Sequence, residues 1–299
     1  MSAVVRSLKL GVPPDWAVAW GEDGHGVFAA FAVGPREDPV EQVLRWIPAG
    51  TFTMGSPDGE LGRFEDEGPQ HAVTLTEGYW LGETPVTQAL WLAVMGDNPS
   101  NFKGAGRRAD LRRPVESVSW DACQDFIERL NRMLHDQWTA RDAERGEPLV
   151  LRLPTEAEWE RACRGGKEPS GATWVGELSG QDRAPELDPI AWYGGNSGSE
   201  THPVGLKDAN PYGLRDMLGN VYEWCEDQGE LRGYGRRYTA ESATNPRSTQ
   251  GPYRVSRGGS WFSDAGFVRA AIRSAYAPGF AGDDLGLRLA GGQAAPSKQ

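Results

Sequence analysis

Alternating apolar and polar positions predict several short strands in the first third of the chain. Residues 16–20 and 27–33 are two apolar runs on either side of the glycine-rich segment 21–26, which is the pattern of a β-hairpin. Further strands are expected at 43–47, 50–54 and 71–81, with a proline-glycine turn between the first two of these.

Apolar residues follow a helical period in three later segments. We expect helices at 86–95 and at 120–135, the second of them with Ser119 as its N-cap. A third helix begins at Thr155, because Thr155 and Glu158 have the spacing of a capping box. Turns and short strands are expected beyond it. The pattern therefore predicts a loop-rich α+β fold with few short helices.

Composition agrees with one elaborate domain. The chain has 299 residues, with 39 glycines for turns and 12 tryptophans as large apolar anchors. We expect residues 1–42 to form a lead-in and hairpin packed on the main domain. The main domain should span 43–290, and 291–299 should be a disordered tail.

Charge and cysteine content exclude several classes of protein. The net charge of −11 would repel a phosphate backbone, so no nucleic-acid partner is expected. No apolar run approaches about 18 residues, and no secretion signal is visible near the N-terminus, so no membrane association is expected. Three widely spaced cysteines do not form a disulfide framework. These features favour the cytoplasm.

Seven short motifs occur in one order along the chain. They are RWIPAGTFTMGS (45–56), ETPVTQ (83–88), PVESVSWD (114–121), RLPTEAEWE (152–160), NPYGLRDMLGNVYEW (210–224), RVSRGGSW (254–261) and LGLRL (285–289). Together they resemble the formylglycine-generating-enzyme, or sulfatase-modifying factor, domain family over residues 43 to 290. That resemblance implies a C-type-lectin-like fold of this family's subtype, and it determines the fold better than the function.

The resemblance also implies a copper site, which this sequence does not complete. In the family two cysteines after the Gly-Gly-Ser motif hold copper(I), and these positions fall on Ser263 and Val268. Neither side chain replaces a soft thiolate, and no cysteine follows Cys225. We therefore expect neither copper binding nor oxidase activity. An enzyme of the same family that uses another site remains an alternative.

A structural calcium ion is a second implication of the resemblance. Carried over from the family, the ligands would be the Asp216 and Glu223 carboxylates and the Gly219 and Val221 carbonyls. Calcium prefers such hard oxygens. The alternative is an ordinary turn whose acidic residues are solvated.

The segment after the copper positions has an unusual composition. Residues 262–289 contain no Lys, Gln, Glu, Met or Trp, whereas all five occur elsewhere in the chain. Codons that end in a pyrimidine cannot encode these five types. Diversity-generating retroelements randomise adenines in Asn codons and yield such a restricted set, and their variable proteins use C-type-lectin-like folds with the diversified stretch near the C-terminus. Chance in a short glycine-rich segment is the alternative.

These observations lead to a hypothesis of function. We expect a non-catalytic protein that binds an unknown protein or small molecule through its C-terminal segment, where aromatic anchors alternate with polar contacts. An accessory domain in a bacterial multi-protein system is another alternative. The predicted binding residues are Trp261, Phe262, Ser263, Asp264, Phe267, Arg273, Tyr276, Phe280 and Asp283.

Overall fold

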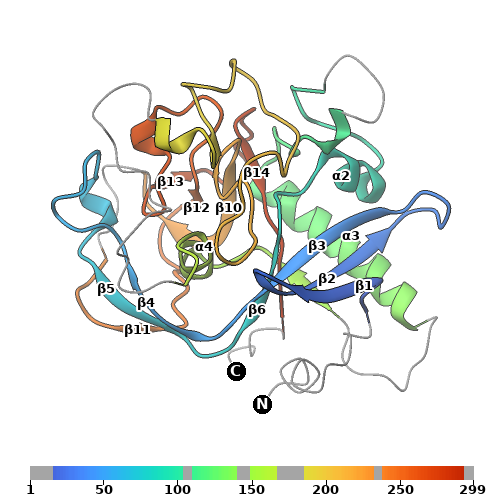
Figure 1. The fold of residues 1–299 in the computed structure, drawn as a ribbon, viewed down its shortest axis with the longest axis horizontal. Coiled ribbons are helices and arrows are strands. Elements are labelled where there is room, and N and C mark those ends of the chain that lie inside the picture. Colours follow the sequence, from blue (N-terminus) through green and yellow to red (C-terminus); the bar gives the residue numbers. More distant parts are fainter. Residues whose placement is uncertain (1–15, 104–109, 140–148, 167–184, 232–237, 293–299) are drawn as a thin grey trace.

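A computed structural model describes residues 16–103, 110–139, 149–166, 185–231 and 238–292 (Figure 1). The α-helices are α2 (Gln88–Met95), α3 (Trp120–Thr139) and α4 (Glu156–Cys163). The 3-10 turns are η1 (Glu65–Glu67), η2 (Asp110–Arg112), η3 (Pro185–Leu187) and η4 (Ala265–Phe267). The strands are β1 (Ala19–Asp23), β2 (Gly26–Val33), β3 (Val40–Ile47), β4 (Gly50–Met54), β5 (His71–Leu75), β6 (Tyr79–Gly82), β7 (Val150–Arg152), β8 (Ala191–Trp192), β9 (Leu218–Gly219), β10 (Tyr222–Gly229), β11 (Ala243–Thr244), β12 (Tyr253–Arg257), β13 (Arg273–Tyr276), β14 (Leu285–Leu287) and β15 (Ala290–Gly292). This mixture of sheets and few helices confirms the predicted fold class.

The largest sheet joins the two ends of the described chain. Its strand order is β1-β2-β3-β6-β15-β7, so the N-terminal hairpin is part of the domain's main sheet. The predicted first strand at 16–20 lies too early, because β1 starts at Ala19. The predicted turn was also too long. The Asp23 carboxylate accepts a hydrogen bond from the His25 backbone N–H at 2.8 Å, which closes a tight turn before Gly26.

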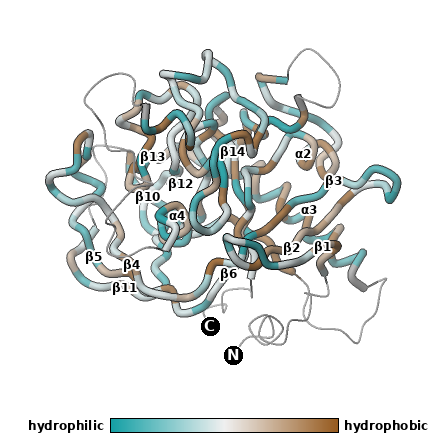
Figure 2. Tube along the Cα trace, viewed as in Figure 1, coloured by the Kyte–Doolittle hydropathy of each residue, from teal (hydrophilic) through white to brown (hydrophobic). Residues whose placement is uncertain are grey.

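Helices α2 and α3 cover this sheet and bury its apolar side chains. Helix α3 starts at its predicted N-cap, where the Ser119 hydroxyl accepts from the Ala122 N–H. At the start of α2 the Thr87 side chain accepts from the Leu90 N–H, an N-cap that the sequence analysis did not name. Trp91 of α2 stacks on Phe126 of α3, with ring centroids 4.8 Å apart. Figure 2 shows hydrophobic residues along β2, β3 and the helices, and hydrophilic residues along the outer loops.

A second layer carries the C-terminal segment. It contains a four-stranded sheet of order β13-β12-β10-β14, a three-stranded sheet of order β11-β5-β4 and the short pair β8-β9. Helix α4 lies against these sheets and is buried along its whole length. The predicted capping box of Thr155 and Glu158 is present at its N-terminus. This layer has a hydrophobic core of its own around Trp159.

Two predicted boundaries need correction. The segment 71–81 was taken as one strand, but it forms β5 and β6 in different sheets, so the chain turns between them. The tail was placed from residue 291, yet Gly291 and Gly292 pair with β7 as part of β15. The rest of the predicted tail, 293–299, lies outside the described residues. Among the described helices, none is long and apolar enough to cross a membrane.

Candidate functional site

Two glycines shape the turn that leads into the C-terminal segment. Gly258 and Gly259 have φ values of +101° and +75°, a region that side chains rarely adopt. A Cβ atom on Gly259 would also lie 2.5 Å from the Phe267 carbonyl oxygen. The chain that follows is held by backbone contacts: the Trp261 N–H donates to the Asn220 carbonyl, and the Gly194 N–H donates to the Ser263 carbonyl, both at 2.9 Å.

The two positions aligned with the copper cysteines have different environments. Ser263 is half-buried, and its hydroxyl accepts from the Ser260 N–H at 2.9 Å and lies 3.2 Å from the Ser260 hydroxyl. Val268 is fully buried in the core. Cys123, Cys163 and Cys225, which are all the cysteines of the chain, are free and buried far apart in sequence. Burial raises the pKa of each of these thiols, which disfavours the thiolate that copper(I) requires.

Four of the predicted binding residues are exposed. Phe262 has 72% of its surface accessible and Phe280 has 43%, which is unusual for such large apolar side chains. Asp264 and Asp283 are exposed as well. Trp261 is largely buried and acts as a support: its ring meets Phe262 edge-on, with 5.4 Å between centroids, and its indole N–H donates to the Asp283 carbonyl at 3.0 Å. We call the exposed residues Phe262, Asp264, Phe280 and Asp283 the C-terminal face.

Phe102 extends this surface, and the sequence reasoning missed it. Its ring meets the Trp261 ring edge-on at 5.1 Å. Both oxygens of the buried Glu116 carboxylate hold the loop in place, by accepting from the Asn101 and Phe102 N–H groups at 3.0 and 2.8 Å. The motif in this loop, Asn-Pro-Ser-Asn-Phe, is a turn signal, but nothing in it indicates which distant residue it contacts.

Two predicted binding residues are only partly exposed. Phe267 packs against Phe64, with 5.6 Å between ring centroids. Tyr276 stacks on Phe280 at 4.8 Å and meets the buried Trp224 edge-on at 6.1 Å. The Tyr276 ring therefore links the exposed Phe280 to the core.

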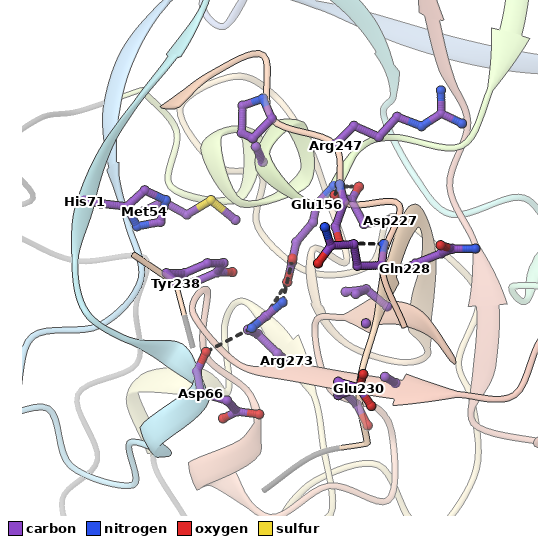
Figure 3. A pocket seen from close by; sticks show the side chains of 18 residues that line it. Met54, Asp66, His71, Glu156, Asp227, Gln228, Glu230, Tyr238, Arg247 and Arg273 are labelled. Atoms are coloured by element: carbon purple, nitrogen blue, oxygen red, sulfur yellow. Dashed lines mark hydrogen bonds and ion pairs between the residues drawn. The ribbon is translucent and has the colours of Figure 1, made fainter. Parts of the chain in front are cut away.

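Arg273 does not lie on the C-terminal face, which corrects the prediction. Its guanidinium forms a paired contact with the two Glu156 carboxylate oxygens at 2.6 and 2.9 Å and donates to the Asp66 carbonyl at 3.0 Å (Figure 3). Along a strand, successive side chains point to opposite faces, so Arg273 and Tyr276 are directed to different sides of β13. Arg273 instead lines a separate cavity of about 720 Å³.

Buried arginines connect the C-terminal segment to the rest of the domain. Arg269 forms a paired contact with the Glu67 carboxylate, at 2.8 and 2.6 Å, and reaches Glu60 at 2.5 Å. Arg257 ion-pairs with Glu160 of α4. These ion pairs hold the backbone that carries the C-terminal face, because a buried charge keeps its partner in a fixed geometry.

The predicted calcium loop is occupied by protein contacts. Both Glu223 oxygens accept hydrogen bonds from the buried Arg288 guanidinium, at 2.8 to 3.1 Å, and one also accepts from the Trp159 indole at 2.6 Å. The Asp216 carboxylate accepts from the Gly205 N–H at 2.7 Å. Gly219 and Val221, whose carbonyls were the remaining predicted ligands, are buried beside these groups. These four predicted ligands therefore fit a calcium ion poorly, because the Arg288 guanidinium already neutralises the Glu223 carboxylate. Calcium binding stays an untested prediction.

Nor do the described residues form a site for another metal. No group of three or more His, Cys, Asp and Glu side chains among them is arranged to hold an ion.

Residues 29–292 match the family described as "Sulfatase-modifying factor enzyme 1-like domain". The chain belongs to this family. The match confirms the resemblance that the seven motifs indicated, and it includes most of β2, so part of the hairpin belongs to the family domain.

Three members or neighbours of the family show the range of its proteins. The solved structure of "Treponema denticola variable protein 1" is 34% identical, with a TM-score of 0.70 over 88% of this chain and 98% of that chain. The formylglycine-generating enzyme of Mus musculus is 30% identical over 86% of this chain and 77% of its own length. The chaperone protein LppX of Paenibacillus barcinonensis is 31% identical over 73% of this chain and 81% of its own length.

Proposed function

We propose that this chain is a non-catalytic ligand-binding protein that presents the C-terminal face on a rigid scaffold of the sulfatase-modifying factor family. The observation that carries the proposal is that exposed side chains extend from a backbone that hydrogen bonds hold in place. Phe262, at 72% exposure, directly follows the buried Trp261, whose backbone and indole groups are both hydrogen-bonded. A surface of this kind can change its residues without loss of the fold.

The chemistry of the face supports recognition better than catalysis. Rigid aromatic side chains supply contact area at a low entropic cost, and neighbouring carboxylates supply direction. The copper positions carry a hydroxyl and a buried isopropyl group in place of two thiols.

The restricted composition of 262–289 and the similarity to a variable protein favour one origin for the face. We propose that a diversity-generating retroelement varies it. A near-copy of the codons for 260–289, with adenines at the positions that differ, should lie close to a reverse-transcriptase gene. Sequencing the DNA on both sides of this gene tests the idea, and a neighbourhood with neither element would refute it.

A tolerance experiment tests the scaffold itself. One library randomises the C-terminal face, and a control library of equal size randomises the buried residues Val268, Ala270 and Ile272 of the same segment. We expect most members of the first library to unfold cooperatively near the wild-type temperature, and few of the second to do so. Equal losses in the two libraries would contradict the proposal.

A further inference from the structure

The cavity beside Arg273 is separate from the C-terminal face. It lies between the β10-β12-β13 sheet, the start of α4 and the β4-β5 hairpin, and its volume of about 720 Å³ is in the range of small-molecule sites. Its apolar wall is formed by buried parts of Met54, Ala157, Val255 and Ala275. The remaining wall is polar. A ligand with a short apolar part and a charged or hydrogen-bonding group would fit such a lining.

The positive charges of the lining are already neutralised. Arg273 pairs with Glu156 through two short contacts, and it lies over the Tyr238 ring at 4.4 Å. Arg247 is directed to Glu226, which is 3.2 Å away and outside the lining. Neither guanidinium therefore offers an unpaired charge to an anionic ligand.

Three carboxylates of the lining form no direct ion pair among the described residues, although Arg273 attracts two of them, Asp66 and Asp227, from a longer distance. Asp66 and Asp227 are buried, with 7% and 4% of their surface exposed, whereas Glu230 lies at the exposed rim of the cavity. Asp227 accepts the Glu156 and Ser248 backbone N–H groups at 2.8 and 2.7 Å, which are neutral donors. Burial, followed by the nearby Glu156 carboxylate, raises the pKa of Asp227 to about 7.

Tyr238 adds an unused hydrogen-bonding group. Its hydroxyl oxygen is buried and has no hydrogen-bond partner among the described residues. Figure 3 shows this hydroxyl directed towards the middle of the cavity, with His71 and Met54 on the same side and Gln228 and Asp227 opposite. A buried hydroxyl without a partner costs free energy, so such a group commonly marks a place where a bound molecule completes the bonding.

We propose that this cavity is a second ligand site, and that it binds a small organic cation bearing primary amino groups. The carboxylates of Asp66 and Glu230 would attract the ammonium group, the Tyr238 hydroxyl would accept one of its N–H bonds, and the apolar wall would contact the methylene chain. The site is independent of the function proposed for the C-terminal face.

Three compounds of similar length and different charge test the proposal by calorimetry at physiological salt. They are 1,4-diaminobutane, 1,4-butanediol and succinate. We expect only the diamine to bind. Glu230→Gln should weaken its binding about tenfold, the size of a hydrogen bond to a charged group, and Tyr238→Phe should weaken it by a smaller factor. Asp66→Asn provides a further variant if one of these fails to fold, as judged by its melting temperature.

The matched control is Glu37→Gln, which removes one negative charge from an exposed loop outside the cavity. It should leave diamine binding unchanged. Four results would overturn the proposal: no binding of the diamine, equal binding of the diol, tighter binding of succinate, or equal weakening by Glu37→Gln and Glu230→Gln. The last would show a general attraction of cations to a chain of net charge −11.

Discussion

Replacing Arg288 with Met should destabilise the domain more than any change on the C-terminal face. The guanidinium is fully buried and donates to Glu223, and to the carbonyls of Gly82, Arg215 and Asp216, at 2.8 to 3.1 Å. Methionine approximates its volume but provides no charge and no donor. Glu223 would then be a buried carboxylate with the Trp159 indole N–H as its remaining side-chain hydrogen-bond donor among the described residues.

The magnitude follows from the loss of one partner of a buried ion pair. Such a change costs about 3–5 kcal/mol, because the remaining charge stays desolvated and uncompensated. Combining Arg288→Met with Glu223→Gln removes that charge, so the double variant should be more stable than the single variant. The double variant should still be less stable than the wild type, because the carbonyls that Arg288 contacts lose their hydrogen-bond donor.

Urea denaturation followed by tryptophan fluorescence measures both changes. The matched control is Arg132→Met, because the Arg132–Glu128 pair is well exposed, at 63% and 68% of the side chains, and should contribute little. A loss below about 1 kcal/mol for Arg288→Met, outside the range of a broken buried pair, would refute the reasoning. A double variant no more stable than the single one would show that the Glu223 charge is not the cause.

The other predictions concern the face, the metals and pH. Phe262→Ala should change the free energy of unfolding by no more than about 0.5 kcal/mol, whereas Phe126→Ala in the core should cost about 3–5 kcal/mol; similar losses in urea melts would place Phe262 in the core. The purified protein should not retain copper(I) or convert the cysteine of a sulfatase-motif peptide to formylglycine, and mass-spectrometric detection of the aldehyde would contradict this. A chelator should leave the melting temperature unchanged, since Arg288 already neutralises Glu223. If the chelator lowers the melting temperature and added calcium raises it again, the protein does bind calcium. The pKa of Asp227 is raised in the folded state, so the native protein holds this proton more tightly than the unfolded chain does. The stability that Asp227 contributes is therefore fully present below its unfolded pKa and falls as pH rises from about 4 to about 7. The free energy of unfolding of the wild type, minus that of Asp227→Asn, should therefore fall as pH rises over that range. A difference that stays constant would show that Asp227 does not titrate there.

Local signals in the sequence were sufficient for the helices and for the family. Thr155 and Glu158 predicted the start of α4 because a capping box depends only on residues three apart. The Gly258-Gly259 pair is a local signal as well: both residues have positive φ values, and Gly259 leaves no room for a Cβ atom beside the Phe267 carbonyl. The absence of a cysteine pair was also decided by the sequence alone, since no folding can supply a missing thiol.

Long-range contacts decided the rest. Arg273 looked like part of a recognition surface, but the strand alternation of β13 and the position of Glu156, more than a hundred residues earlier, direct it into a cavity. Phe102 lies beside the C-terminal face, because Glu116 holds its loop where the Phe102 ring contacts Trp261. Glu223 had the residue type of a calcium ligand, yet Arg288 occupies its oxygens. A sequence motif specifies which groups are available, whereas the partner of each buried charge depends on which distant segment packs against it.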